Sequence, residues 1–218
     1  GILAYSRSYW FPSEIRQMTL TVYGQAQSRA VRALWMVEEL GIPYTHVPTR
    51  FADEAKGAEF RAVNPNGRVP TIDDDGFVVF ESMAINLYLA KRYGGPLAPR
   101  DLKEDALATQ WSFWVMTEVE KTLLQALFHR TGFMGMERSE AKALEYLAQL
   151  DRPLRVLEGA LVEREHLLGA RFTVADLNVA SVFAWASMAG LDLAPYPHVG
   201  AWLTRCLARP ALARANAR

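Results

Sequence analysis

The chain has 218 residues, of which 50% are hydrophobic and 22% are charged, a composition typical of a globular protein that can bury a sizeable core. Its 24 lysine and arginine residues equal its 24 aspartate and glutamate residues, so we expect no overall field that would attract nucleic acid or an anionic membrane. No apolar run reaches the ~18 residues of a membrane span, which excludes a membrane from the expected partners.

The first residues stand apart from the rest. Met18 directly precedes the first strand-like run, so we interpret residues 1–17 as an upstream extension or cloning remnant outside the folded core. We expect the first domain to span residues 18–93.

Within 18–93, short β-rich runs alternate with helical periodicity. The predicted strands are Leu20–Tyr23, Tyr44–Pro48, Val69–Ile72 and Phe77–Phe80, the last two joined as a hairpin through an Asp-Gly turn. The predicted helices are Ser28–Leu40, Asp53–Val63 and one that Ser82 begins and Gly94 follows. The element order is therefore βαβαββα.

Residues 94–100 contain Gly-Gly-Pro and are predicted to form a linker. No strand pattern follows, so we expect residues 101–218 to form an all-helical domain. Its predicted helices are Asp101–His129, Ser139–Glu165, Thr173–Ala189 and His198–Ala208. The change in composition predicts an α/β domain followed by an all-α domain.

Two local features can carry binding chemistry. Pro70 follows Val69 where a hairpin begins, so it is either an ordinary trans proline on an edge strand or a cis proline that turns the Val69 backbone toward a cleft. Glu81 and Ser82 stand at a strand-to-helix junction, where free backbone N–H groups can bind a carboxylate and Glu81 can pair with an ammonium. The alternative is that Ser82 is a plain helix N-cap.

Taken together, these motifs closely resemble those of the cytosolic glutathione transferases, in particular bacterial members. The resemblance rests on SRAVRALWMVEELGIPY at 28–44, NPNGRVPTI at 64–72, ESMAINLYL at 81–89 and a Thr173–Asp176 capping box in FTVAD at 172–176. It implies an N-terminal thioredoxin-like domain that binds glutathione and a C-terminal all-helical domain that holds an apolar co-substrate.

The resemblance also assigns roles to individual residues. Val69, presented by Pro70, would pair its backbone with the cysteine of glutathione, and Glu81 with Ser82 would bind the γ-glutamyl end. Arg68 would approach the glycine carboxylate, or it is simply a solvated loop charge.

The residue that activates the thiol is predicted from the same resemblance. Ser28 is our first choice, because it lies five residues after Tyr23 at the expected start of a helix. The alternatives are Tyr23 itself, which we expect to point into the strand core, and a site at Gln25, which departs from the hydroxyl of serine-type members. The other interpretation of Ser28 is that it only caps its helix.

For the co-substrate, an aromatic-rich helix predicts an apolar pocket, in which Trp114 and Thr117 are the expected cleft-facing residues. The implied activity is attack of the glutathione thiolate on a small hydrophobic electrophile or a hydroperoxide. The alternative is a non-catalytic glutathione-binding or protein-interaction module. Members of this family form homodimers, so a homodimer is expected.

Cysteine and histidine usage limits the other chemistries. Cys206 is the only cysteine, which excludes an intrachain disulfide framework and favours a reducing, cytoplasmic setting. The four histidines are scattered and none is expected to pair with a cysteine, so we predict no metal site (His46, His129, His166 and His198).

Overall fold

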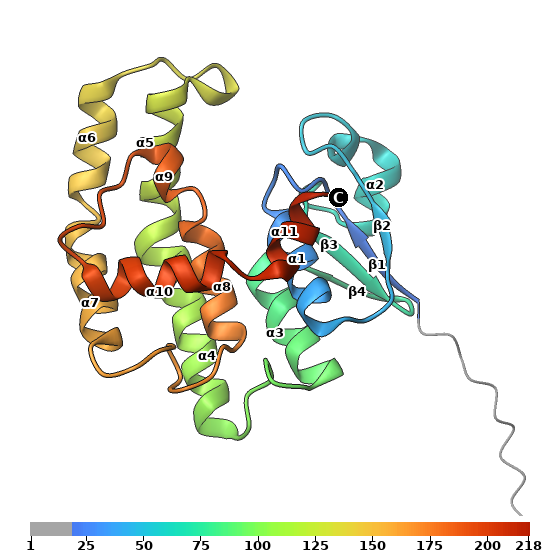
Figure 1. The fold of residues 1–218 in the computed structure, drawn as a ribbon. Coiled ribbons are helices and arrows are strands. Elements are labelled where there is room, and N and C mark those ends of the chain that lie inside the picture. Colours follow the sequence, from blue (N-terminus) through green and yellow to red (C-terminus); the bar gives the residue numbers. More distant parts are fainter. Residues whose placement is uncertain (1–18) are drawn as a thin grey trace, which may run out of the picture.

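The computed structural model describes residues 19–218 and has two domains lying side by side (Figure 1). The predicted extension at 1–17 lies outside the described residues. In the first domain, β1 (Leu20–Tyr23) runs parallel to β2 (Thr45–Val47) and antiparallel to β3 (Thr71–Asp74). β3 pairs antiparallel with β4 (Phe77–Phe80), giving the strand order β2-β1-β3-β4. This confirms the predicted thioredoxin-like βαβαββα arrangement.

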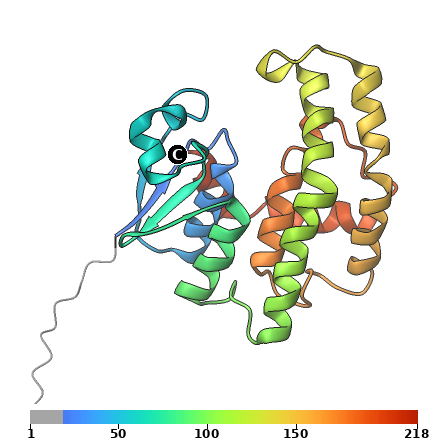
Figure 2. The same ribbon diagram turned by 180° about the vertical axis from the view of Figure 1, so that it is seen from behind.

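Three α-helices and a short 3-10 turn complete this domain: α1 (Ala30–Leu40), η1 (Glu54–Lys56), α2 (Ala58–Val63) and α3 (Ser82–Tyr93). α1 and α3 lie between the sheet and the second domain, and α2 lies on the far side (Figures 1 and 2). Every α1 residue from Ala30 to Glu38 is buried, because the helix is covered on both sides. α1 ends at Gly41, whose left-handed φ of 63° closes the last turn as predicted.

The second domain is all-helical, as predicted. Its elements are α4 (Leu102–Trp114), the π-helix η2 (Val115–Glu120), α5 (Lys121–Thr131), η3 (Phe133–Gly135), α6 (Glu140–Ala148), α7 (Asp151–Leu161), α8 (Val174–Phe183), α9 (Ala186–Ala189), α10 (Pro197–Leu207) and α11 (Pro210–Asn216). All ten residues of α8 are buried, and the predicted Thr173–Asp176 capping box is present at its start. Among residues 19–218, no helix is long and apolar enough to cross a bilayer.

Several predicted helices are divided in the structure. The prediction of one helix over Ser139–Glu165 is wrong in its middle, where the helix is interrupted between α6 and α7. Pro153 has no N–H to donate to the carbonyl of Gln149, so an unbroken helix cannot form there. Asp53–Val63 is interrupted at Gly57, whose backbone is extended. α11 was not predicted, and it returns to pack against α1 of the first domain (Figure 1).

A buried polar chain joins the two domains. Asn86 of α3 donates from Nδ2 to Oδ1 of Asn178 at 2.8 Å, and Asn178 donates from Nδ2 to Oγ of Ser112 at 2.8 Å. All three side chains are buried, so each unmade bond would leave a desolvated polar group. These hydrogen bonds therefore fix α3 relative to α4 and α8. They also fix the start of α3, at Ser82, beside the second domain.

Candidate functional site

Three segments that lie far apart in sequence meet at one end of the sheet. Tyr23 of β1 pairs with Thr71 of β3, and Thr71 pairs with Phe80 of β4. The residues that follow Tyr23, precede Thr71 and follow Phe80 therefore share one edge. The sheet register thus brings together the predicted site segments 24–28, 68–70 and 81–82.

Gly24 allows the first of these segments to lie against the second. Its φ is +126°, and a Cβ there would stand 2.5 Å from Cβ of Ala30 and 2.9 Å from Cβ of Val69. Its N–H donates to the Val47 carbonyl at 2.9 Å, and its own carbonyl lies 2.8 Å from Nε2 of His46. An L-side chain would be both strained and without space, so glycine permits this close approach.

The Val69–Pro70 peptide bond is cis, so the trans alternative is wrong. Asn64, only 1% exposed, secures the preceding turn by donating from Nδ2 to the Arg68 carbonyl at 2.8 Å and to Oγ1 of Thr71 at 3.0 Å. Val69 is half-buried beside Gly24, and the Arg68 side chain is exposed. The turn is therefore held by Asn64, which leaves the Arg68 side chain in solvent.

At the third segment, the helix start is open. Glu81 is exposed and has a φ of +71°, uncommon for a side chain other than glycine, and its carbonyl accepts the Ile85 N–H at 2.9 Å. No side chain caps α3, whereas Asp101, Ser139 and Thr173 cap α4, α6 and α8. The interpretation of Ser82 as an N-cap is therefore wrong. The first-turn N–H groups remain suited to an anion.

Ser82 instead contacts a buried arginine that sequence reasoning missed. Its Oγ accepts from Nη1 of Arg32 at 3.3 Å, and Arg32 is fully buried in α1. Nη2 of Arg32 lies 2.8 Å from Oε1 of Glu120, and Nε of Arg29 donates to the same oxygen at 2.7 Å. The sequence contains one signal for this contact: Arg32 is the only cation in α1, within a run of apolar residues. Two guanidiniums thus share one carboxylate beneath the site.

Burial and charge shift the pKa values of this cluster. Desolvation lowers the pKa of Arg32 from its ordinary value, against the attraction of Glu120. Desolvation alone would raise the pKa of Glu120, but Arg32 and Arg29 outweigh it and hold that pKa below its usual range. Because arginine stays protonated in proteins, Arg29 and Arg32 bring two positive charges to the one carboxylate of Glu120.

The candidate activating residues lie in the first segment or, for Tyr23, at the end of β1 directly before it. Ser28 donates its hydroxyl proton to the Gln25 carbonyl at 2.7 Å and accepts the Ala30 N–H at 3.1 Å. The helix begins two residues later than predicted, at Ala30, but Ser28 still binds its first turn. Tyr23 is half-buried and packs edge-on against Phe60 with ring centroids 5.8 Å apart. Gln25 contributes its backbone carbonyl through the bonds from Ser28.

The π-helix η2 presents the second domain to this site. Met116 Sδ lies 3.8 Å from Nη1 of Arg32. Of the two predicted co-substrate residues, Trp114 is half-buried and packs edge-on against Trp111 at 5.0 Å between centroids. Thr117 is exposed, and its hydroxyl donates to helix carbonyls, which leaves its methyl group as the apolar surface. Both residues flank Met116 in the chain.

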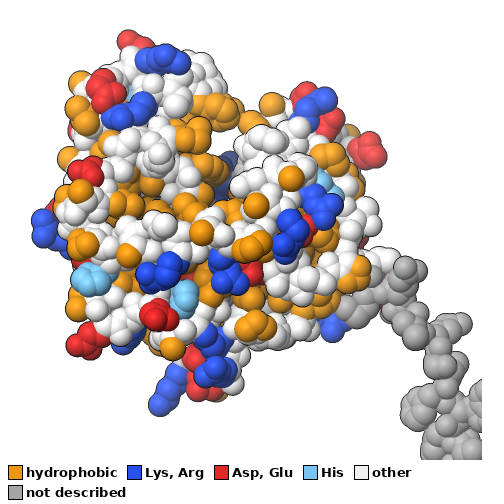
Figure 3. Space-filling model, viewed as in Figure 1, with side chains coloured by type: hydrophobic (Ala, Val, Ile, Leu, Met, Phe, Trp, Pro, Cys, Tyr) orange, Lys and Arg blue, Asp and Glu red, His pale blue; other side chains and the backbone are white. Residues whose placement is uncertain are grey.

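Aromatic side chains also bridge the domains farther along. Phe133, after α5, stacks on Phe128 at 5.4 Å and lies 6.4 Å from Phe51 of the first domain, measured between ring centroids. In the view of Figure 3, the surface is hollowed between the two domains, and hydrophobic side chains gather along the helical wall. The bridge places an apolar boundary between the two domains.

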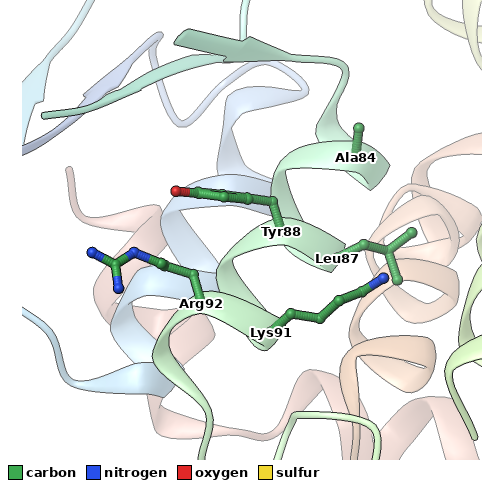
Figure 4. A pocket seen from close by; sticks show the side chains of 5 residues that line it. All are labelled: Ala84, Leu87, Tyr88, Lys91 and Arg92. Carbon is green, nitrogen blue, oxygen red and sulfur yellow. The ribbon is translucent and has the colours of Figure 1, made fainter. Parts of the chain in front are cut away.

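Two shallow depressions lie away from this site. One, of about 460 Å³, runs along α3 from its first turn to its last (Figure 4), and is lined by Ala84, Leu87, Tyr88, Lys91 and Arg92. The other, of about 310 Å³, lies where α7 ends beside α10. Neither includes Val69, Glu81 or Ser82. Because the chemistry-bearing residues lie elsewhere, we place the site at the shared sheet edge.

One histidine does meet the cysteine, contrary to prediction. His166, Asp176 and Cys206 have potential ligand atoms within 4.8 Å of one another. Asp176 already accepts from the Leu167 N–H and the Trp202 indole through Oδ1, and from Thr173 through Oδ2. Burial raises the pKa of the Cys206 thiol, so it stays protonated. The cluster is accounted for by the packing and capping of α8.

Comparison with known proteins identifies the family. Residues 18–91 match the family model described as Glutathione S-transferase, N-terminal domain, and residues 107–210 match Glutathione S-transferase, C-terminal domain. The chain belongs to the glutathione S-transferase family. A glutathione S-transferase theta-1 from Bos taurus is 32% identical over 200 residues, which make up 86% of this chain and 82% of that protein.

Solved structures of the family agree with the fold. The theta-class glutathione S-transferase of Xanthomonas axonopodis pv. citri, with glutathione bound, is 32% identical with a TM-score of 0.81, and the match covers 91% of this chain and 97% of that one. Ure2p in complex with glutathione is 25% identical with a TM-score of 0.80, covering 92% and 94%. Glutathione-bound family members therefore have the same two-domain arrangement.

Proposed function

We propose that the chain binds glutathione at the edge formed by Val69, Glu81 and Ser82 and directs its thiolate at an apolar electrophile or a hydroperoxide. The observation that carries this proposal is the α3 start, which lacks a side-chain cap and has an acidic residue beside it. A γ-glutamyl group carries a carboxylate and an ammonium on one carbon. The helix start is suited to the carboxylate and Glu81 to the ammonium.

The remaining roles follow the same placement. The half-buried Val69 backbone would pair with the peptide of glutathione, and the exposed Arg68 would reach the glycine carboxylate. Ser28 would donate to the thiolate after its hydroxyl turns away from the Gln25 carbonyl, a rotation that a hydroxyl group permits. The sulfur would then lie beside the first turn of α1.

For the co-substrate, we propose the apolar surface between the domains. Trp114 and the methyl group of Thr117 contribute from η2 and its flank, and the Phe51–Phe133 contact bounds the far side. Flat or extended apolar electrophiles suit such a lining. A Phe133→Ser variant should raise the KM for an aryl halide and leave glutathione affinity unchanged.

A non-catalytic glutathione-binding module is the second candidate. The observation that favours it is that the Ser28 hydroxyl proton is already donated to the Gln25 carbonyl. If this bond persists when glutathione binds, the thiol has no hydroxyl donor from Ser28. Binding would then occur without rapid turnover.

We also propose a homodimer and a cytoplasmic location. Large apolar side chains are exposed on β4 and α4: Phe77, Val78, Phe80, Leu102 and Phe113. Together with the α3 depression in Figure 4, they offer a surface that a second copy can cover. Light scattering during gel filtration distinguishes a dimer from a monomer of 24.5 kDa.

Calorimetry with glutathione tests the central proposal. Glu81→Gln and Ser82→Ala should each weaken binding through loss of a charge-assisted hydrogen bond, which corresponds to ~1.5–3 kcal/mol. Exposed Glu163→Gln serves as the control for a distant loss of charge. Turnover is measured with an aryl halide and a hydroperoxide. Binding of glutathione without turnover of either substrate favours the non-catalytic module. Absence of glutathione binding rejects both candidate functions.

A further inference from the structure

The buried guanidinium of Arg32 is a charge that the proposed glutathione site does not yet use. Arg32 is fully buried, and transfer of a cation into a protein interior is costly unless the cation is paired and hydrogen-bonded. Its pairing is incomplete. Among the described residues, Nε has no acceptor, and Nη2 lies close to Glu120 in a geometry unsuited to a hydrogen bond.

The surroundings of Arg32 direct its charge toward the α3 start. The guanidinium lies 5.2 Å from the Trp185 ring centroid, which supports it from the second domain. Glu120 compensates it only in part, because Arg29 donates to the same carboxylate oxygen. Within residues 19–218, the hydroxyl that Arg32 contacts is that of Ser82, the residue beside Glu81.

This contact decides what the Ser82 hydroxyl can do. A serine hydroxyl has one proton to donate and two lone pairs that accept. Arg32 occupies a lone pair at 3.3 Å, which leaves the proton of Ser82 available to an anion. A neighbouring cation also makes the hydroxyl a stronger donor, and the low dielectric of the buried surroundings strengthens the effect.

We propose that Arg32 is a positioning residue for the α-carboxylate of the ligand's γ-glutamyl group, acting through the hydroxyl of Ser82. The inference rests on the proposed binding of glutathione. Glu81 attracts the ammonium, and the Ser82 hydroxyl, whose oxygen accepts from Arg32, donates its proton to the carboxylate. Because Arg32 is inaccessible, it selects for the carboxylate without touching the ligand.

A comparison of two ligands tests this role. Glutathione and its analogue γ-aminobutyryl-cysteinyl-glycine differ only in the α-carboxylate, so their affinity ratio isolates the contribution of that group. The wild-type chain should prefer glutathione by ~10-fold or more, as measured by calorimetry. Arg32→Met should reduce this preference by ~10-fold through loss of glutathione affinity alone.

Arg29→Met is the matched control, because Arg29 binds the same carboxylate but is half-exposed and has no contact with Ser82. It should keep more of the preference than Arg32→Met does, because the contact between Arg32 and Ser82 remains. In Arg32→Met, Glu120 retains Arg29 as a partner, so no lone buried carboxylate is created. If Arg32→Met does not fold, Arg32→Lys is the second variant. It keeps the charge but replaces the planar fork, whose Nη1 and Nη2 reach Ser82 and Glu120 separately, with one ammonium on a different stem, and the preference should fall.

A double-mutant cycle with Ser82→Ala checks that Arg32 acts on the ligand preference through Ser82. The preference of the Arg32→Met/Ser82→Ala double variant should equal that of Ser82→Ala alone. An unchanged preference in a folded Arg32 variant overturns the inference while glutathione binding stands. An equal loss in Arg29→Met also overturns it, because the effect would then belong to the whole cluster. No glutathione binding by the wild type rejects the proposed function as well.

Discussion

Glu39 at the end of α1 and Arg209 before α11 are joined by two parallel hydrogen bonds of 2.6 and 2.7 Å. The Arg209 guanidinium also lies 3.9 Å from the centroid of Phe172. Glu39 further accepts the Trp35 indole N–H at 2.9 Å. This one carboxylate therefore ties the C-terminal segment to the helix that begins at the proposed thiol site.

Loss of this pair should destabilise the protein. Arg209→Ala removes both bonds and leaves a nearly buried carboxylate on Glu39 without its cation, so the free energy of unfolding should fall by ~1–3 kcal/mol. Arg155→Ala is the control, since its pair with Asp151 is exposed and should contribute ~0–1 kcal/mol. Urea unfolding measures both, and equal effects would contradict the assigned importance of Arg209.

Stability in acid should depend on Glu38. Burial alone would raise the pKa of Glu38, but bonds from Tyr44, Arg218 and Arg214 outweigh it and hold that pKa at about 2, below its ordinary 4.5. The unfolded chain takes up this proton near 4.5. The stabilisation is therefore complete above that pH and is lost as the pH falls toward 2.

Glu38→Gln should remove this part of the pH dependence. The difference in unfolding free energy between about pH 6 and about pH 3 should be smaller in the variant than in the wild type. Exposed Glu163→Gln, which makes the same change of charge, should retain the wild-type difference. If Glu38→Gln shows the same difference as the wild type, the bonds of Glu38 to Tyr44, Arg214 and Arg218 do not provide this stabilisation.

Local patterns predicted the fold well because each strand and helix has a local period. β1 and β4 begin and end where predicted, and the division between α6 and α7 had a local signal in Pro153 that was overlooked. α11 has a proline at its start and is short, so its stability depends on docking against α1. Such docking has no local signature.

The arrangement of the candidate site could be predicted in part for the same reason. Val69, Pro70, Glu81 and Ser82 belong to two short motifs, and the β3–β4 register brings these together. The contact of Arg32 with Ser82 spans 50 residues of sequence and depends on tertiary packing. The π-helix that carries Glu120 differs from an α-helix only in hydrogen-bond register, which composition does not reveal.

Asp176 should be the most sensitive position in the helical domain. It is fully buried and accepts from the N–H groups of Thr173 and Leu167 and from the Trp202 indole. Asp176→Ala leaves all of these buried donors without their acceptor. It should lower the free energy of unfolding by ~3–5 kcal/mol or prevent folding. Thr173→Ala removes the cap at the Ala175 N–H and the bond from the Thr173 hydroxyl to Asp176, and should cost ~1 kcal/mol. Thermal unfolding should rank the two variants in this order, and a reversed order would contradict it.

The thiol test separates the two candidate functions. If the Ser28 hydroxyl turns from the Gln25 carbonyl to the bound sulfur, Ser28→Ala removes a bond to the thiolate, and the pKa of bound glutathione should rise by ~1–2 units. Because the thiolate is the reactive form, the rise of kcat/KM with pH should shift upward by the same amount. Ultraviolet absorbance of the thiolate follows the titration directly.

Tyr23→Phe is the paired variant, because it removes the alternative hydroxyl and keeps the ring that packs on Phe60. If the pKa of bound glutathione rises in Tyr23→Phe and does not change in Ser28→Ala, the activating hydroxyl is that of Tyr23. No change in either would exclude both hydroxyls and leave the Gln25 position and the backbone at the start of α1 as the candidates. Ser28 would then serve through the bonds that the structure already contains, from its hydroxyl to Gln25 and from Ala30 to its oxygen.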